Sequence, residues 1–435
     1  PSSSFSTTSF PPSLRWRRMG LGKLPPCLAP RPPGDLSAPR ALANMLKNLI
    51  GLGILTLPYA TAQVGWLPSV AGMALVAGLS LCGILLSVAA LARLQALRGA
   101  EAPECEAVIA DGGREESRQD DDLGLSFFPL LVGEVVGGPA QLVCALSFVF
   151  GQYATGVAYV DIVATNLVII AAGGDDSARL AVLLALGALL ALLSLTESLR
   201  GVAYLSIFGL AMYAWIFLAL ISENVAFGTA DSVVAVNTSS PNYGCWFGLT
   251  SFSFAGLPVA MLIHDDMEGP EQFQGVMTGS YAITWVLYCS AAMLGYLCYG
   301  ASSDGVIYLS FKEYVFYQGS VLAVAVILTM SYVLQMMLVF DWTQGVCARS
   351  SALSWIPRWA VRSAIVGSTI FVAYCIPDVI SVLDNLGSFA GVLCNFIFPA
   401  LVYAKLTDPD EVAARALCVL LFVFGTVGGI SATFA

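Results

Sequence analysis

The sequence predicts an all-α protein that crosses a membrane many times. Of its 435 residues, 57% are hydrophobic and only 11% are charged, and the mean hydropathy is +0.80. Soluble domains carry about 25% charged residues. Apolar runs such as residues 180–195, taken with their neighbours, are long enough to cross about 30 Å of hydrocarbon. Because the backbone in lipid must satisfy its own hydrogen bonds, each run is expected to be a helix.

Eleven spanning helices are expected from these runs. They cover residues 41–64, 67–93, 138–169, 179–198, 201–222, 247–265, 277–299, 314–340, 360–377, 380–404 and 412–434. Residues 1–40 are rich in Ser, Pro and Arg and are expected to form a disordered cytosolic tail or a transit-like segment. Residues 96–125 are expected to form an acidic cytosolic loop, in which 101–122 hold nine acidic and two basic side chains.

The distribution of Lys and Arg predicts the orientation in the membrane. With the N-terminus in the cytosol, sixteen basic residues fall on the cytosolic side and two, Arg179 and Lys312, on the opposite side. An odd number of helices then leaves the C-terminus on the exoplasmic side. The sequon at Asn237 lies in an exoplasmic loop between the fifth and sixth helices, where it is a candidate for glycosylation.

The first helix contains residues that disfavour a continuous helix. The stretch NLIGLGILTLPYA, residues 48–60, holds Gly51, Gly53 and Pro58. The sixth helix has a second set, Gly256 and Pro258, five helices later. Interrupted helices at matching positions of two halves indicate a transporter binding site at the level of the bilayer midplane. The sequence therefore predicts two five-helix halves with a site between the two breaks.

The breaks offer a defined chemistry. Unwinding frees backbone N–H groups at Leu52, Gly53 and Ile54, at the positive end of a half-helix, which suits a carboxylate. Freed carbonyls of the two helices suit an ammonium group, so an amino acid fits both. The predicted substrate-binding residues are Gly51, Leu52, Gly53, Ile54, Ser251, Phe252, Ser253, Phe254 and Gly256.

Five stretches in the right order resemble the amino acid/auxin permease family. They are NMLKNLIGLGILTLPYATAQVGW, GVAYVDIVATNL, SFSFAGLPVAMLIHDDMEGPEQF, SAAMLGYLCYG and IPDVISVLDNLGSFAGVLCNFIFPALVY, and the resemblance covers residues 41–435. It implies eleven helices, a leucine-transporter-like 5+5 inverted repeat with broken helices 1 and 6, and an amino acid transporter transmembrane domain. Lys47 and Asn166 point to the proton-coupled and vacuolar-type branch.

The resemblance also implies residue roles. The backbone of Leu52 and Gly53 would hold the substrate carboxylate. The carbonyls of Lys47 and Ile50, with hydroxyls near Thr329 and Ser331, would surround the position that binds sodium in related folds. The chain departs from the family at three positions, where it has Ala255, Val333 and His264, and these departures affect substrate selectivity and the coupling ion.

Ionisable residues inside the bilayer are candidates for ion coupling. Asp161, Glu134 and Asp384 are the acidic candidates. His264 titrates nearest neutral pH, although its place at a helix end beside acidic residues also fits a solvated terminus. Lys47 could instead supply a fixed cation that repels sodium and favours protons.

The resulting hypothesis is a secondary transporter of neutral amino acids that works by alternating access and is driven by protons. The alternatives are an amino acid sensor of the same fold with little flux, a sodium-coupled transporter, and a channel. No P-loop, CxxC or HExxH motif is present, so we expect no enzyme, no cofactor, no bound metal and no nucleic acid partner. The expected location is the plasma membrane or a vacuolar or lysosomal membrane.

Overall fold

The computed structural model describes residues 28, 34–99, 127–195, 202–239, 241–349, 355–376 and 378–434. The described chain is almost entirely helical, with one isolated β-bridge, between Leu36 and Met267. The predicted acidic loop, beyond its first four residues, and nearly all of residues 1–33 lie outside the described residues.

All eleven predicted segments contain helix. The first half comprises α2 (Ala38–Leu49), α3 (Gly53–Val64), α4 (Trp66–Gly99), α7 (Gly138–Ala172), α8 (Arg179–Ser194) and α9 (Val202–Phe227). The second half comprises α10 (Tyr243–Ser253), α11 (Leu257–Asp266), α12 (Phe273–Tyr299), α13 (Tyr314–Arg349), α14 (Arg358–Cys375), α15 (Val379–Leu386) and α16 (Phe398–Leu406), followed by α17 (Val412–Thr433). A short helix that the sequence did not predict, α6 (Phe127–Val135), precedes α7.

Seven spans among the described residues are long and apolar enough to cross a membrane, or eight if α2 and α3 count as one bent span. The helices α8, α9 and α14 occupy the predicted fourth, fifth and ninth spans. Two of these helices are shorter than the 18 residues required of a spanning helix: α8 has 16 residues, and the apolar stretch of α9 is limited to Ala211–Phe227. The chain is thus an all-helical, multi-pass membrane protein.

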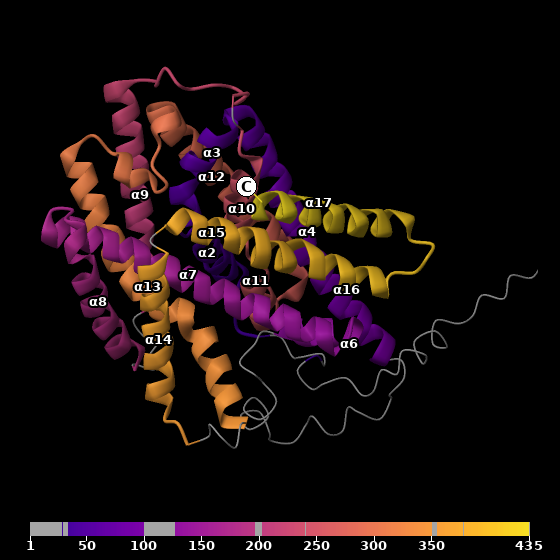
Figure 1. Cartoon of the computed structure of the whole chain (residues 1–435). Helices are drawn as coiled ribbons and strands as arrows, with labels where there is room; N and C mark the ends of the chain where they lie inside the picture. Colours follow the sequence, from indigo (N-terminus) through magenta and orange to yellow (C-terminus); the bar gives the residue numbers. More distant parts are fainter. Residues whose placement is uncertain are drawn as a thin grey trace, which may run out of the picture.

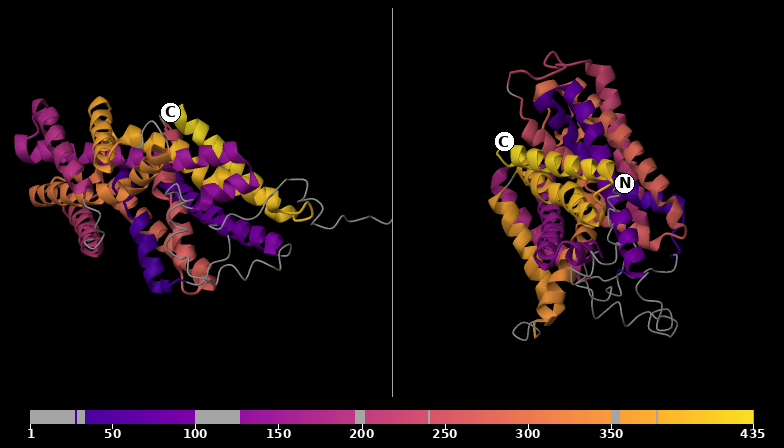
Figure 2. Two further views of the ribbon diagram at one scale, coloured as in Figure 1. Left: turned by 90° about the horizontal axis from the view of Figure 1, so that it is seen from below. Right: turned by 90° about the vertical axis from the view of Figure 1, so that its right-hand side faces the viewer.

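The interrupted helices lie in the centre of the molecule. Figure 1 shows α3, α10 and α12 together there, while α7 runs obliquely from α8 on one side to α6 on the other. The helix α12 packs against both α2 and α3, and α7 packs along α13. Figure 2 shows α16 and α17 side by side at one edge, where they also contact each other.

The span that contains α15 and α16 has two turns of π-helix in its middle. These turns are η8 (Gly387–Gly391) and η9 (Leu393–Ile397). Of the seven long apolar spans among the described residues, Ile380–Leu406 is the most deeply buried, since 78% of its most apolar 18-residue stretch lies inside the protein. A π-turn widens the helix and is frequent at functional sites. Here Gly387 lets the wide turn approach the backbone of Gly248 in α10, where a Cβ would overlap the carbonyl oxygen of Gly248.

The first helix begins earlier than predicted. Ala38 rather than residue 41 starts α2, and the preceding residues are fixed to the end of α11. Leu36 donates its N–H to the carbonyl of Asp266 at 2.9 Å and accepts from the N–H of Glu268 at 3.0 Å. Residues 34–40, which the sequence assigned to a disordered tail, therefore join the free ends of the two broken helices.

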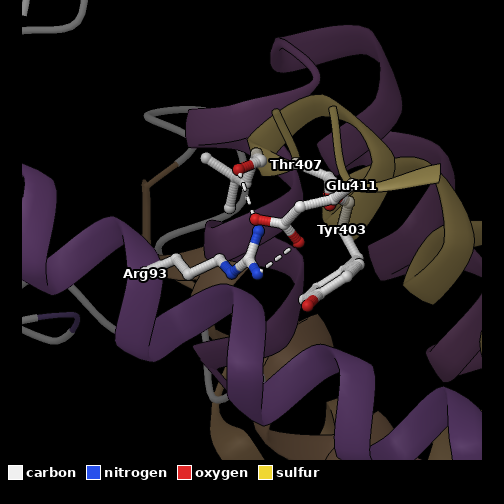
Figure 3. A network of polar contacts seen from close by, with 5 residues as sticks. Arg93, Tyr403, Thr407 and Glu411 are labelled. Carbon is white, nitrogen blue, oxygen red and sulfur yellow. Dashed lines mark hydrogen bonds and ion pairs between the residues drawn. The ribbon is translucent and has the colours of Figure 1, made fainter. Parts of the chain in front are cut away.

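A polar network joins the end of α4 to the turn between α16 and α17 (Figure 3). Arg93 donates to Glu411 at 2.7 Å, and its guanidinium carbon lies 4.8 Å from the centre of the Tyr403 ring. Because both charged side chains are about a third exposed, we expect this ion pair to contribute about 1 kcal/mol or less to stability.

Candidate substrate-binding site

The first break separates α2 from α3 by a bend of 52°. The helix α2 ends at Leu49, and Ile50 leaves helical geometry with φ −74° and ψ 86°. Gly51 and Leu52 connect it to Gly53, the first residue of α3. As at every helix start, the first N–H groups of α3 have no carbonyl one turn earlier to bond, and they carry the positive end of the helix dipole.

The second break interrupts the sixth span without a comparable bend. The helix α10 ends at Ser253, α11 begins at Leu257, and Phe254 and Gly256 are not helical. The two pieces form one span, Tyr243–Asp266, and 72% of its most apolar 18-residue stretch is buried. Both predicted interruptions are therefore present, and they differ in shape.

The two breaks touch each other. A Cβ built on Gly53 would lie 2.7 Å from the Cβ of Ser253, closer than real Cβ atoms approach. A Cβ on Gly256 would lie 2.5 Å from Cε of Met45 and 2.9 Å from the hydroxyl of Tyr281. A side chain at residue 53 would therefore collide with the backbone of α10, whereas one at residue 256 would have to displace the ends of the Met45 and Tyr281 side chains.

Two tyrosines of α12 bind the carbonyls that the breaks release. The hydroxyl of Tyr288 donates to the carbonyl of Leu49 and lies 3.2 Å from that of Ser253, so it bridges the two broken helices. The hydroxyl of Tyr281 donates to the carbonyl of Phe254 at 3.1 Å. Buried carbonyls without a partner destabilise a membrane protein by several kcal/mol each, so these hydroxyls make the unwound backbone tolerable.

A cavity opens where the breaks meet. Its empty volume, including its opening to solvent, is about 830 Å³. It is lined by Asn48, Leu49, Gly51, Leu52, Gly53, Ser147, Phe148, Gly151, Gln152, Thr155, Tyr159, Phe252, Ser253, Ala255, Pro258, Val259, Gln335, Leu386, Ala390, Gly391, Cys394 and Asn395.

The cavity surrounds the breaks and opens beside α2. On the first span its lining includes Asn48 and Leu49 of α2 but only Gly53 of α3. On the sixth span it includes Phe252 and Ser253 of α10 as well as Pro258 and Val259 of α11. Because Asn48 is exposed, the cavity reaches the surface beside α2.

Of the nine predicted substrate-binding residues, five line this cavity. They are Gly51, Leu52, Gly53, Phe252 and Ser253. The other four, Ile54, Ser251, Phe254 and Gly256, are buried beside the cavity and do not line it. Phe254 is 0% exposed because its ring packs against the rings of Tyr281 and Tyr288, so it supports the break rather than forming a wall.

The predicted coupling residues are scattered. Lys47 is exposed and Ile50 is half-buried, both next to the cavity in sequence. Thr329 lies against Tyr159 and Tyr332, away from α2, and its hydroxyl donates to the carbonyl of Ala325 at 2.7 Å. Ser331 does not line the cavity either. The grouping of these two hydroxyls with the carbonyls of Lys47 and Ile50 stays a prediction.

The acidic candidates differ in their surroundings. Asp161 forms an ion pair with Arg179 at the start of α8, with side chains only 6% and 18% exposed. Asp384 is half-buried beside Gly248, and its Oδ1 is buried with no hydrogen-bond partner in the described part of the chain. His264 packs edge-on against Phe273 and lies 3.6 Å from Asp265, outside the cavity.

The sequon residue lies at the other end of the first span from α2. Asn237 donates its side-chain amide to the carbonyl of Gln63 at 3.0 Å, and its N–H bonds the carbonyl of Val64. Gly65, with φ 90°, ends α3 there and leaves space for the backbone of residues 235–237. This loop thus closes over the end of α3 that lies away from the cavity.

Sequence reasoning missed most polar residues of the cavity. Gln152 of α7 and Gln335 of α13 are hydrogen-bonded to each other across it. Asn395, in the second π-turn, donates to the carbonyl of Ser251 at 3.3 Å. The available signal was an amide side chain in the middle of an apolar span, because such groups are costly in lipid and face the protein interior.

Comparison with known proteins gives a consistent result. A family described as "Transmembrane amino acid transporter protein" matches residues 34–435. Amino acid transporter AVT1D of Arabidopsis thaliana is 23% identical over 93% of this chain and 70% of the relative. Amino acid transporter AVT3A of the same organism is 24% identical over 94% of this chain and 91% of the relative.

Two solved structures share the fold. The first is MhsT in complex with L-phenylalanine, with a TM-score of 0.55 and 10% identity, covering 91% of this chain and 97% of that one. The second is a manganese transporter of Eremococcus coleocola, with a TM-score of 0.52 and 12% identity, covering 92% and 86%. The likeness shows a leucine-transporter-like fold. Since the family match spans nearly all of the sequence, this chain belongs to the transmembrane amino acid transporter family and is a transporter rather than an enzyme.

Proposed function

We propose that this protein is a secondary active transporter that carries neutral amino acids by alternating access and is coupled to protons. The observation that carries the proposal is the cavity at the junction of the two breaks, lined by Gly51, Leu52 and Gly53 on one side and Ser253 on the other. The α3 N-terminus suits the substrate carboxylate, and the released carbonyls near it suit the ammonium group.

The shape of the cavity supports alternating access. Its lining includes the exposed Asn48 of α2, while α3 and α10 pack against each other on the other side of the breaks. With the orientation expected from the basic residues, this opening would lie on the cytosolic side, as in an inward-facing state. An outward-facing state would require α10 to separate from α15 and η8, which it contacts closely here.

The cavity wall supports neutral substrates. None of its described lining residues is Asp, Glu, Lys, Arg or His. A charged substrate side chain would therefore enter without a compensating partner in a medium of low dielectric constant, which is unfavourable by several kcal/mol. The carboxylate and ammonium groups of the substrate are matched instead by backbone dipoles.

Proton coupling is supported by Asp384. Its unpartnered Oδ1 lies at the contact between α15 and α10, with Tyr59, Cys245 and Asp378 as the neighbouring ionisable groups. Each of these is neutral or negative, so none of them would stabilise a carboxylate. Protonation removes the cost of burying that charge.

The test is uptake by the purified full chain in proteoliposomes. Radiolabelled neutral amino acids are offered with an imposed pH gradient or an imposed sodium gradient, each without the other. We expect saturable accumulation that follows the pH gradient. Accumulation that follows the sodium gradient would contradict proton coupling. The absence of any saturable uptake or counterflow would contradict the proposed transport function.

A further inference from the structure

Gln152 and Gln335 form a pair of amides in the cavity wall. The proposed recognition of the substrate carboxylate and ammonium groups at the breaks does not use this pair. Gln152 comes from α7 and Gln335 from α13, two helices that pack along each other. Their side-chain amides are hydrogen-bonded, and both residues are half-buried with atoms facing the cavity.

A single hydrogen bond leaves half of this pair unused. Whichever amide donates, one NH₂ group and one carbonyl oxygen of the pair remain free. Both groups belong to residues that line the cavity. The pair thus offers one donor group and one acceptor at the same place.

The hydroxyls that line the cavity nearby do not offer the same combination. Ser147 donates to the carbonyl of Val143 at 2.7 Å, and Thr155 donates to the carbonyl of Gly151 at 2.9 Å, so both use their hydrogen inside α7. The described wall also includes the hydroxyl of Tyr159 and the amides of Asn48 and Asn395, of which Asn395 donates to the carbonyl of Ser251. The two glutamines differ from these groups in that their amides are hydrogen-bonded to each other.

We propose that Gln152 and Gln335 select the substrate side chain and favour a carboxamide, as in glutamine. A carboxamide presents its own carbonyl oxygen and NH₂ in one plane and can bond the free donor and the free acceptor together. An apolar side chain of equal length would leave both groups of the wall without partners. This inference rests on the proposed function and names the substrate class of the same cavity.

The first experiment uses the unmodified protein. Uptake of radiolabelled glutamine into proteoliposomes is measured in competition with unlabelled glutamine, norleucine and glutamate. Norleucine matches the length of glutamine but has no amide, and glutamate replaces the amide with a charge. We expect glutamine to compete at a concentration at least about tenfold lower than either analogue. Equal competition by norleucine would overturn the proposal.

The second experiment removes each amide with little change in length. Gln152→Met and Gln335→Met are assayed separately for glutamine and for leucine uptake. We expect each to lower the ratio of glutamine to leucine uptake by about tenfold. The matched control is Gln344→Met on the same helix, since Gln344 does not line the cavity; its ratio should equal that of the unmodified protein.

The outcomes separate this proposal from the one on which it rests. If the unmodified protein moves no amino acid, the proposed function fails. If it moves leucine and glutamine but the variants lose both in parallel, the amides have a structural role only and the selectivity proposal fails. Should one variant not fold, the other variant and the norleucine competition still decide.

Discussion

Gly53 of α3 and Ser253 of α10 lie in direct contact where the first and sixth membrane spans are interrupted. A Cβ on Gly53 would lie 2.7 Å from the Cβ and 2.9 Å from the Cα of Ser253. The two residues are 200 positions apart in the sequence. Their contact places the start of one half-helix against the end of another and creates the junction at which the cavity opens.

The contact makes residue 53 intolerant of a side chain. We expect Gly53→Leu to lower uptake at least about tenfold, because overpacking by one side chain costs about 1–3 kcal/mol and shifts the junction. The measurement is initial uptake by purified protein in proteoliposomes. Gly78→Leu in α4 is the control, since no atom lies within 4 Å of a Cβ built there. Normal uptake by Gly53→Leu would show that substrate does not bind at this junction.

Tyr288 joins the two breaks from α12. We expect Tyr288→Phe to lower the free energy of unfolding by about 1–3 kcal/mol, because it leaves the carbonyls of Leu49 and Ser253 buried without a donor. Thermal unfolding in detergent measures the loss, and uptake should fall with it. Tyr314→Phe serves as the control, since Tyr314 is 74% exposed. An unchanged unfolding temperature would contradict the bridging role.

Glu223 is fully buried near the end of α9 and accepts three hydrogen bonds. Its donors are the hydroxyl of Tyr299 and the backbone N–H groups of Lys312, at 2.8 Å, and Glu313, at 2.9 Å. We expect Glu223→Ala to lower the free energy of unfolding by about 3 kcal/mol, since these donors lose a charged acceptor. The measurement is thermal unfolding, with Glu313→Ala as the control because the Glu313 side chain is exposed. Equal stability of the two variants would refute the expectation.

Asp384 is the acidic group expected to carry the proton. We expect Asp384→Asn to abolish accumulation driven by a pH gradient while retaining counterflow, in which labelled and unlabelled substrate exchange without net proton movement. The reason is that asparagine keeps the shape of the neutral acid but cannot titrate. Asp378→Asn is the control on the same helix, where Asp378 is exposed and caps α15.

Both assays are run on the same vesicles. Proton-driven accumulation by Asp384→Asn at the level of the unmodified protein would rule out this residue as the proton site. Loss of counterflow together with accumulation would show a structural defect instead of a loss of coupling.

The pairing of Asp161 with Arg179 assigns this acid a structural role. We expect Asp161→Asn to reduce stability but to leave the pH dependence of uptake unchanged. In a double-mutant cycle with Arg179→Ala, the two substitutions should not add, because each removes the same partly buried ion pair. Full additivity in unfolding experiments would contradict the pairing.

The sequence by itself determined that the chain lies in a membrane, the places of eleven helical segments and the positions of both breaks. Hydropathy decides which segments enter lipid, and Gly and Pro act on the backbone within a few residues, so these properties are local. Gly51, Gly53 and Gly256 therefore marked the breaks without any knowledge of packing. The family motifs in order also implied the fold, which the structural likeness to other transporters confirms.

Tertiary structure alone decided which side chains face the cavity. Thr329 and Gln335 are separated by six residues of α13, a rotation of about 240°, so Gln335 reaches the cavity while Thr329 does not. Ser331 lies on the same face as Gln335 but about one turn along the helix, and it does not line the cavity. Phe254 flanks a break in sequence but is covered by Tyr281 and Tyr288. Gln152 is bonded to Gln335, 183 positions away, and Ser253 contacts Gly53 in the other half of the chain. Such contacts depend on how whole helices pack against one another, which local sequence does not encode.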